Sequence, residues 1–76
     1  MARVAEFKEL RKERNSLHEI VECTYTVFVS DAGKRILQID SYGTKHRKLS
    51  GKVSQTLQFD EQTALRLQSL IADTFG

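Results

Sequence analysis

The sequence predicts an α+β domain, an antiparallel meander of three to four strands with a helix at each end, in the order α-β-β-β-α. Apolar and polar residues alternate over 17–29, 35–42 and 52–59, as in strands with one buried face. Residues 61–75 instead repeat apolar side chains at helical spacing. The 76 residues contain no linker and no proline, so we expect a single domain over 1–76.

Residues 2–14 are predicted to form the N-terminal helix. Val4, Phe7 and Leu10 make an apolar stripe, and most of the other side chains are charged residues that favour helix. A stripe this narrow is not stable alone. We therefore expect the helix to lie against the rest of the domain or against a partner.

The strand predicted over 17–29 is rich in β-branched and aromatic residues. Cys23 shares the parity of the apolar positions, so we expect it in the core and not as a nucleophile. An Asp–Ala–Gly turn over 30–34 then leads to the second strand, 35–42. In the third strand, 52–59, one face carries Val53, Leu57 and Phe59, and the other carries Ser54, Thr56 and Gln58.

The C-terminal helix over 61–75 follows Asp60, a residue suited to the N-cap, and has Glu61 in its first turn. A chain this short has a core that supplies only about 3–5 kcal/mol of net stability. Its single cysteine excludes an internal disulfide, so association is the favoured source of further stability. We expect a homodimer that buries the apolar stripe Leu67, Ile71 and Phe75.

Composition excludes several classes of function. The chain is 29% charged and 39% hydrophobic, which is typical of a soluble globular protein, and no apolar run is long enough for a membrane span. No signal peptide is evident at the N-terminus, so we expect a cytoplasmic protein. No metal or cofactor is expected, because the lone cysteine and two separated histidines do not match a ligand set.

We also expect no enzyme activity. Asp60 is at the position of a helix N-cap, and Glu61 is in the first turn, where the helix dipole favours an acidic residue, so neither position indicates catalysis. Asp40 sits among apolar strand residues, where we expect a structural role, for example in a pair with a neighbouring cation. His18 and His46 have no evident partner for acid–base chemistry.

The connection between the second and third strands is strongly basic. It contains Lys45, Arg47, Lys48 and Lys52, and no acidic residue occurs in 41–59. Beside it lie an aromatic residue, Tyr42, and the hydroxyls of Ser54 and Thr56. Cations of this kind bind phosphates, an aromatic ring stacks on a base, and hydroxyls and amides contact sugars or base edges. The sequence therefore predicts a small protein that binds nucleic acid, with single strands preferred over duplex.

Two alternatives remain open. The basic connection can be an ordinary solvated loop. The chain can also be a protein-interaction module, a small regulator of phage or plasmid type that docks through its N-terminal helix or a sheet edge. The choice between DNA and RNA is open as well.

Over residues 35–71 the sequence resembles the single-stranded-DNA-binding domain of the positive-cofactor-type transcriptional coactivators. The corresponding segments are LQIDSYG, TKHRKLSGK, VSQTLQF and DEQTALRLQSLI. The family's helix usually carries a tryptophan where this chain has Thr63. The resemblance implies a curved four-stranded sheet, a C-terminal helix that pairs two subunits, and single-stranded DNA, the preferred ligand, lying across the strands. The same resemblance implies an accessory role in transcription or replication. It also implies that Tyr42 is the sheet-edge aromatic residue and that Lys45, Arg47, Lys48 and Lys52 contact phosphates.

Overall fold

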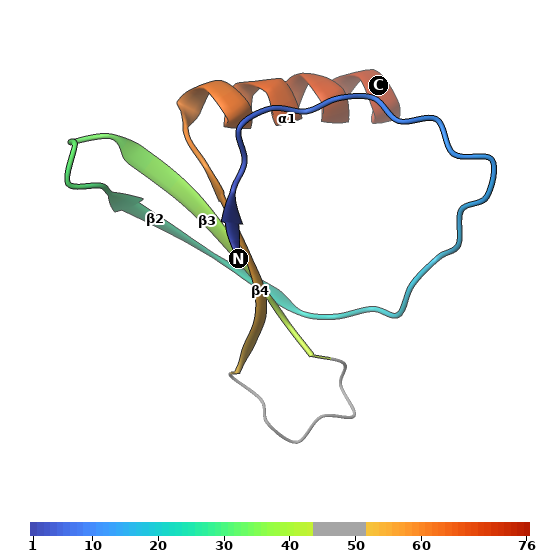
Figure 1. The fold of residues 1–76 in the computed structure, drawn as a ribbon, viewed down its shortest axis with the longest axis horizontal. Coiled ribbons are helices and arrows are strands. Elements are labelled where there is room, and N and C mark those ends of the chain that lie inside the picture. Colours follow the sequence, from blue (N-terminus) through green and yellow to red (C-terminus); the bar gives the residue numbers. More distant parts are fainter. Residues whose placement is uncertain (44–51) are drawn as a thin grey trace.

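The computed structural model describes residues 1–43 and 52–76, which form a four-stranded sheet with one helix at its end (Figure 1). The elements are β1 (Ala2–Arg3), β2 (Cys23–Val29), β3 (Arg35–Tyr42), β4 (Val53–Phe59) and α1 (Glu61–Phe75). The strand order is β1-β4-β3-β2. The α+β class is confirmed. The wholly antiparallel meander is wrong, because β1 runs parallel to β4.

The strand register gives the sheet two different faces. Cross-strand partners lie on the same face, and successive residues lie on opposite faces. We call one side the polar face; it carries Thr24, Thr26, Gln38, Asp40, Thr56 and Gln58, and the apolar pair Phe28 and Ile36 lies on the same side at the hairpin end. We call the other side the apolar face; it carries Tyr25, Val27, Leu37, Ile39, Leu57 and Phe59.

The helix predicted over 2–14 is absent. Ala2 and Arg3 instead pair with Leu57 and Gln58 of β4, and the Val4 N–H donates to the Gln58 carbonyl at 2.9 Å. From there the chain reaches β2 through a wide arc without helix or strand (Figure 1). The three-residue stripe is too narrow to hold a helix, so pairing with the open edge of β4 prevails over helix propensity.

The first predicted strand, 17–29, begins only at Cys23. Its partner β3 ends at Tyr42, whose N–H donates to the Glu22 carbonyl at 3.1 Å. Beyond that bond, no described residue pairs with 17–21. Cys23 is exposed, so its prediction as a core residue is wrong. Its side chain has the parity expected of a buried position, but nothing among the described residues covers this part of β2.

The hairpin between β2 and β3 forms as its turn residues predict. The Ser30 N–H donates to the Lys34 carbonyl, and the Gly33 N–H donates to the Ser30 carbonyl, both at 2.8 Å. Gly33 has a φ of 79°, a left-handed conformation that a residue with a Cβ adopts at a cost. The turn therefore fixes the register of β2 against β3.

The core is very small. Among the described residues, Ile36 and Phe59 are the only buried hydrophobic side chains. The ring of Phe7 stacks on that of Phe59 with 6.3 Å between centroids. Phe7, predicted to lie on a helix, thus contributes to the core from an extended segment.

Helix α1 spans the residues that the sequence predicts and is capped at both ends. The Asp60 Oδ1 atom accepts from the Thr63 N–H at 2.8 Å and from the Thr63 hydroxyl at 3.0 Å. At the other end, Gly76 has a φ of 91° and donates its N–H to the Ala72 carbonyl. These contacts satisfy backbone groups that a helix end leaves unpaired.

Replacing Asp60 by asparagine should reduce the loss of stability in acid. The Thr63 N–H, and then the Thr63 hydroxyl, hold the pKa of Asp60 below its ordinary value of 3.8. The ionised cap therefore stabilises the fold fully above pH 3.8, and this contribution is lost as the pH falls through the lower folded pKa. We expect the Tm difference between the wild type and Asp60→Asn to shrink below pH 3.8.

The measurement is thermal unfolding followed by circular dichroism across that pH range. Asp73→Asn is the control, because Asp73 is exposed and caps no helix N-terminus. A Tm difference between the wild type and Asp60→Asn that does not change with pH would contradict the role of the ionised cap.

Candidate nucleic-acid interface

Hydrogen bonds join the polar side chains of β3 and β4 into one network. The Thr56 hydroxyl donates to Asp40 Oδ1 at 2.6 Å. Gln38 Nε2 lies 3.2 and 3.1 Å from the two Asp40 carboxylate oxygens, and its Oε1 accepts from Gln58 Nε2 at 2.8 Å. Because each side chain is held by a neighbour, the polar face presents its amides and hydroxyls in a fixed arrangement.

Asp40 lies at the centre of this network and is only 8% exposed. Among the described residues no cation pairs with Asp40, and its hydrogen bonds come from the neutral side chains of Gln38 and Thr56. A buried carboxylate needs such donors, because removing its water shell is unfavourable. Asp40 is therefore part of the polar face's structure, as the sequence predicts, but its neutral donors Gln38 and Thr56 were not predicted. The alternation of Gln38 and Asp40 with Thr56 on the next strand was the available signal.

Tyr42 ends β3 next to an irregularity in the sheet. The register shifts between Ser41 and Tyr42, and the Tyr42 and Thr24 hydroxyls lie 2.9 Å apart, within hydrogen-bond distance. A bulge of this kind increases local twist and redirects side chains. The contact with Thr24, a residue of the polar face, ties the phenol to β2.

The predicted residues of β4 share the same end of the sheet as Tyr42. Val53 is opposite Tyr42 in the register, and Lys52 and Ser54 on either side of Val53 are exposed. Thr56 is half-buried and engaged with Asp40. Lys45, Arg47 and Lys48 lie outside the described residues. Their sequence positions fall between the ends of β3 and β4, next to Tyr42 and Lys52.

Sequence reasoning missed one cation of the sheet. Arg3 pairs with Gln58 through β1, so an exposed guanidinium lies in the row that contains Gln38 and Gln58. The prediction of a helix over 2–14 concealed this position. No signal in the sequence places a two-residue strand beside β4.

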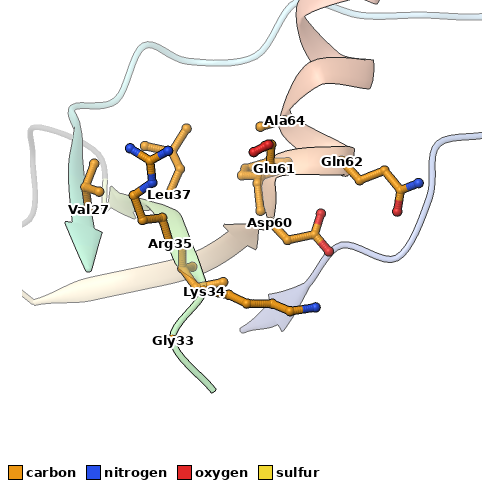
Figure 2. Close-up of a pocket in the computed structure, with 11 residues that line it drawn as sticks. Val27, Gly33, Lys34, Arg35, Leu37, Asp60, Glu61, Gln62 and Ala64 are labelled. Atoms are coloured by element: carbon orange, nitrogen blue, oxygen red, sulfur yellow. The ribbon is translucent and has the colours of Figure 1, made fainter. Parts of the chain in front are cut away.

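An open groove of about 650 Å³ lies on the other side of the sheet (Figure 2). Val27, Leu37 and Phe59 of the apolar face line it together with Ala64 of α1. Charged side chains of Lys34, Arg35, Asp60 and Glu61 surround it. The groove separates the first turns of α1 from β2, so nothing in 1–43 or 52–76 covers this part of the apolar face.

The residues predicted for a dimer interface lie along α1. Leu67 is half-buried, whereas Ile71 and Phe75 are 49% and 82% exposed. These two exposed side chains remain available to a partner.

Within residues 1–43 and 52–76, no group of three His, Cys, Asp or Glu side chains forms a metal site. The described helix is too short and too polar to cross a membrane. Comparisons of the chain with protein-family models, with curated proteins and with solved structures gave no match.

Proposed function

We propose that this protein binds single-stranded nucleic acid, DNA in preference, across the polar face of its sheet. The observation that carries the proposal is the continuity of that face. Two rows of polar side chains, Thr24–Asp40–Thr56 and Thr26–Gln38–Gln58, cross β2, β3 and β4, and Tyr42 and Lys52 lie at the strand ends beyond the first row. The basic connection of the sequence begins at the same end.

Each part of this surface has a role that suits an unpaired strand. Lys45, Arg47, Lys48 and Lys52 bind phosphates at one end, and Tyr42 stacks on a base. Ser54 and Thr56 contact sugars or base edges. Arg3 adds a phosphate contact beside Gln58.

A duplex is a poorer partner for this surface. Reading the major groove takes a helix or a two-stranded ribbon that enters the groove and contacts base edges. Helix α1 carries only one cation, Arg66, and its two acidic side chains, Glu61 and Asp73, weaken its attraction to phosphates. An accessory role in transcription or replication, where single strands are exposed, agrees with this preference.

Affinity for single-stranded DNA should fall steeply with salt. About four phosphate contacts, each contributing about −0.7, give a slope of roughly −3 in a plot of log affinity against log salt concentration. Fluorescence anisotropy of a labelled oligothymidine measures it, with duplex DNA and single-stranded RNA of the same length as comparisons. A slope near zero, or tighter binding to the duplex, would contradict the proposal.

The triple variant Lys45→Ala/Arg47→Ala/Lys48→Ala should lose most of this affinity and remain folded. The matched control is Arg11→Ala/Lys12→Ala/Arg14→Ala, which removes three cations from an exposed segment away from the sheet. The control should bind as the wild type does within a few-fold. If both triple variants lose affinity equally, binding depends on net charge and not on the basic connection.

A second candidate function, a protein-interaction module, has its own support. The N-terminal helix proposed as one docking element is absent, but strand β2 lies at the edge of the sheet with all seven residues exposed.

A further inference from the structure

Strand β2 is an edge strand without the usual protection. All seven of its residues, CTYTVFV, are exposed, and none of them is charged or proline. Natural edge strands are normally shortened, bulged, covered, or marked with lysine or proline, because their free backbone groups otherwise pair with another chain. β2 pairs with β3 without a register shift along its whole length.

The free backbone groups of β2 belong to its odd-numbered residues. At the two ends of the hairpin, the Tyr42 N–H donates a hydrogen bond to the Glu22 carbonyl, and the Ser30 N–H donates one to the Lys34 carbonyl. Bonding alternates along an antiparallel ladder, so the even-numbered residues between them face β3. Cys23, Tyr25, Val27 and Val29 therefore direct their N–H and C=O groups away from the sheet.

The same residues carry the uncovered part of the apolar face. Tyr25, Val27 and Val29 are 76%, 60% and 63% exposed, and the groove beside α1 opens onto Val27. The edge thus combines free hydrogen-bonding groups with an unburied apolar row, which is the arrangement that strand addition uses.

The chain exposes far more surface than a compact protein of its size. Its accessible surface is 7362 Å², whereas a folded monomer of 8.7 kDa exposes about 4,700 Å². The excess, about 2,600 Å² per chain, includes the arc over 5–22, where every residue except Phe7 is exposed, and the edge strand β2, where all seven residues are exposed. The radius of gyration, 14.7 Å, likewise exceeds the roughly 11 Å expected for 76 residues.

We propose that two copies of this protein pair β2 against β2 in antiparallel orientation, forming one continuous sheet of eight strands. A pairing centred on Thr26 brings all seven residues of each strand into register. It sets Tyr25 against Val27 and Cys23 against Val29 of the second copy, so the two apolar faces become one. Aromatic and β-branched partners of this kind stabilise neighbouring strands.

A second copy fits this edge better than an unrelated protein does. The strand carries no charge that would select a different partner, and the pairing is complementary to itself under twofold symmetry. The interface differs from the one predicted for Leu67, Ile71 and Phe75, and it requires no nucleic acid.

Sedimentation equilibrium should give twice the 8.7 kDa of the single chain. Val27→Lys should raise the dimer dissociation constant roughly a hundredfold or more, because it places a charge in the apolar row of each copy. The matched control is Ile71→Lys, at a similarly exposed position on α1, which should leave the dimer unchanged. A wild-type monomer, or a dimer that Ile71→Lys dissociates and Val27→Lys does not, would overturn the proposal.

Disulfide crosslinking tests the same interface in a protein that remains a dimer. Its result therefore does not depend on whether a variant that dissociates, such as Val27→Lys, still folds. In the proposed register, Thr26 faces Thr26 of the second copy as a non-hydrogen-bonded pair, with Cα atoms about 4.5 Å apart, a separation that permits a disulfide. Cys23→Ser/Thr26→Cys should therefore form a crosslinked dimer on mild oxidation. Cys23→Ser/Thr24→Cys should not, because its thiols lie about four residues apart along the strands. Equal crosslinking of both variants, or none of either, would contradict the register.

Discussion

Replacing Phe59 by alanine is expected to leave much of the protein unfolded at room temperature. Phe59 is 4% exposed and is one of two buried hydrophobic side chains among the described residues. Removing a buried phenylalanine costs about 3–5 kcal/mol, which is as large as the roughly 3–5 kcal/mol that a core of this size supplies. The change also removes the surface on which Phe7 stacks. Urea unfolding followed by circular dichroism at fixed protein concentration measures the loss.

Two variants separate this core effect from the general loss of an aromatic ring. Phe59→Leu retains most of the apolar volume and should cost less than Phe59→Ala. Phe75→Ala removes the same ring from a side chain that is 82% exposed, and it should change the free energy of unfolding by about 0.5 kcal/mol or less. A loss for Phe75→Ala as large as that for Phe59→Ala would instead support the predicted helix interface, where Phe75 is buried by a partner.

Replacing Asp40 by alanine should lower the free energy of unfolding by roughly 1.5–3 kcal/mol. The change leaves the Thr56 hydroxyl and the Gln38 amide without their acceptor, and unpaired polar groups in a half-buried network are unfavourable. Asp40→Asn keeps one carbonyl oxygen for the Thr56 hydroxyl, so its cost should be smaller. The same urea titrations measure both variants.

Asp73→Ala controls for the loss of a carboxylate, because Asp73 is exposed on α1. It should change stability by about 0.5 kcal/mol or less. If Asp40→Ala has an equally small effect, the hydrogen bonds around Asp40 do not stabilise the fold. The Asp40→Asn variant also tests the proposed interface. It removes a negative charge from the centre of the polar face, so it should tighten binding of single-stranded DNA at low salt.

The candidate interface was predicted only in part, for an identifiable reason. Alternation along one strand shows which residues share a face, and this placed Ser54 and Thr56 on the opposite face from Leu57. It does not show which residues of a neighbouring strand they meet. The bonds from Thr56 to Asp40 and from Gln58 to Gln38 depend on the β3–β4 register, which no single strand contains.

Three local features of this protein follow from short stretches of its sequence. The cap at Asp60, the span of α1 and the turn at Gly33 follow from contacts within a few residues, so their signals are complete in a short stretch. The two faces of the strands follow from a period of two. Tertiary structure decided how these pieces meet. Ala2 and Arg3 became a strand because the edge of β4 was open to them, and β2 begins at Cys23 because β3 ends at Tyr42. Both outcomes depend on partners distant in sequence, and local propensity carries no information about them.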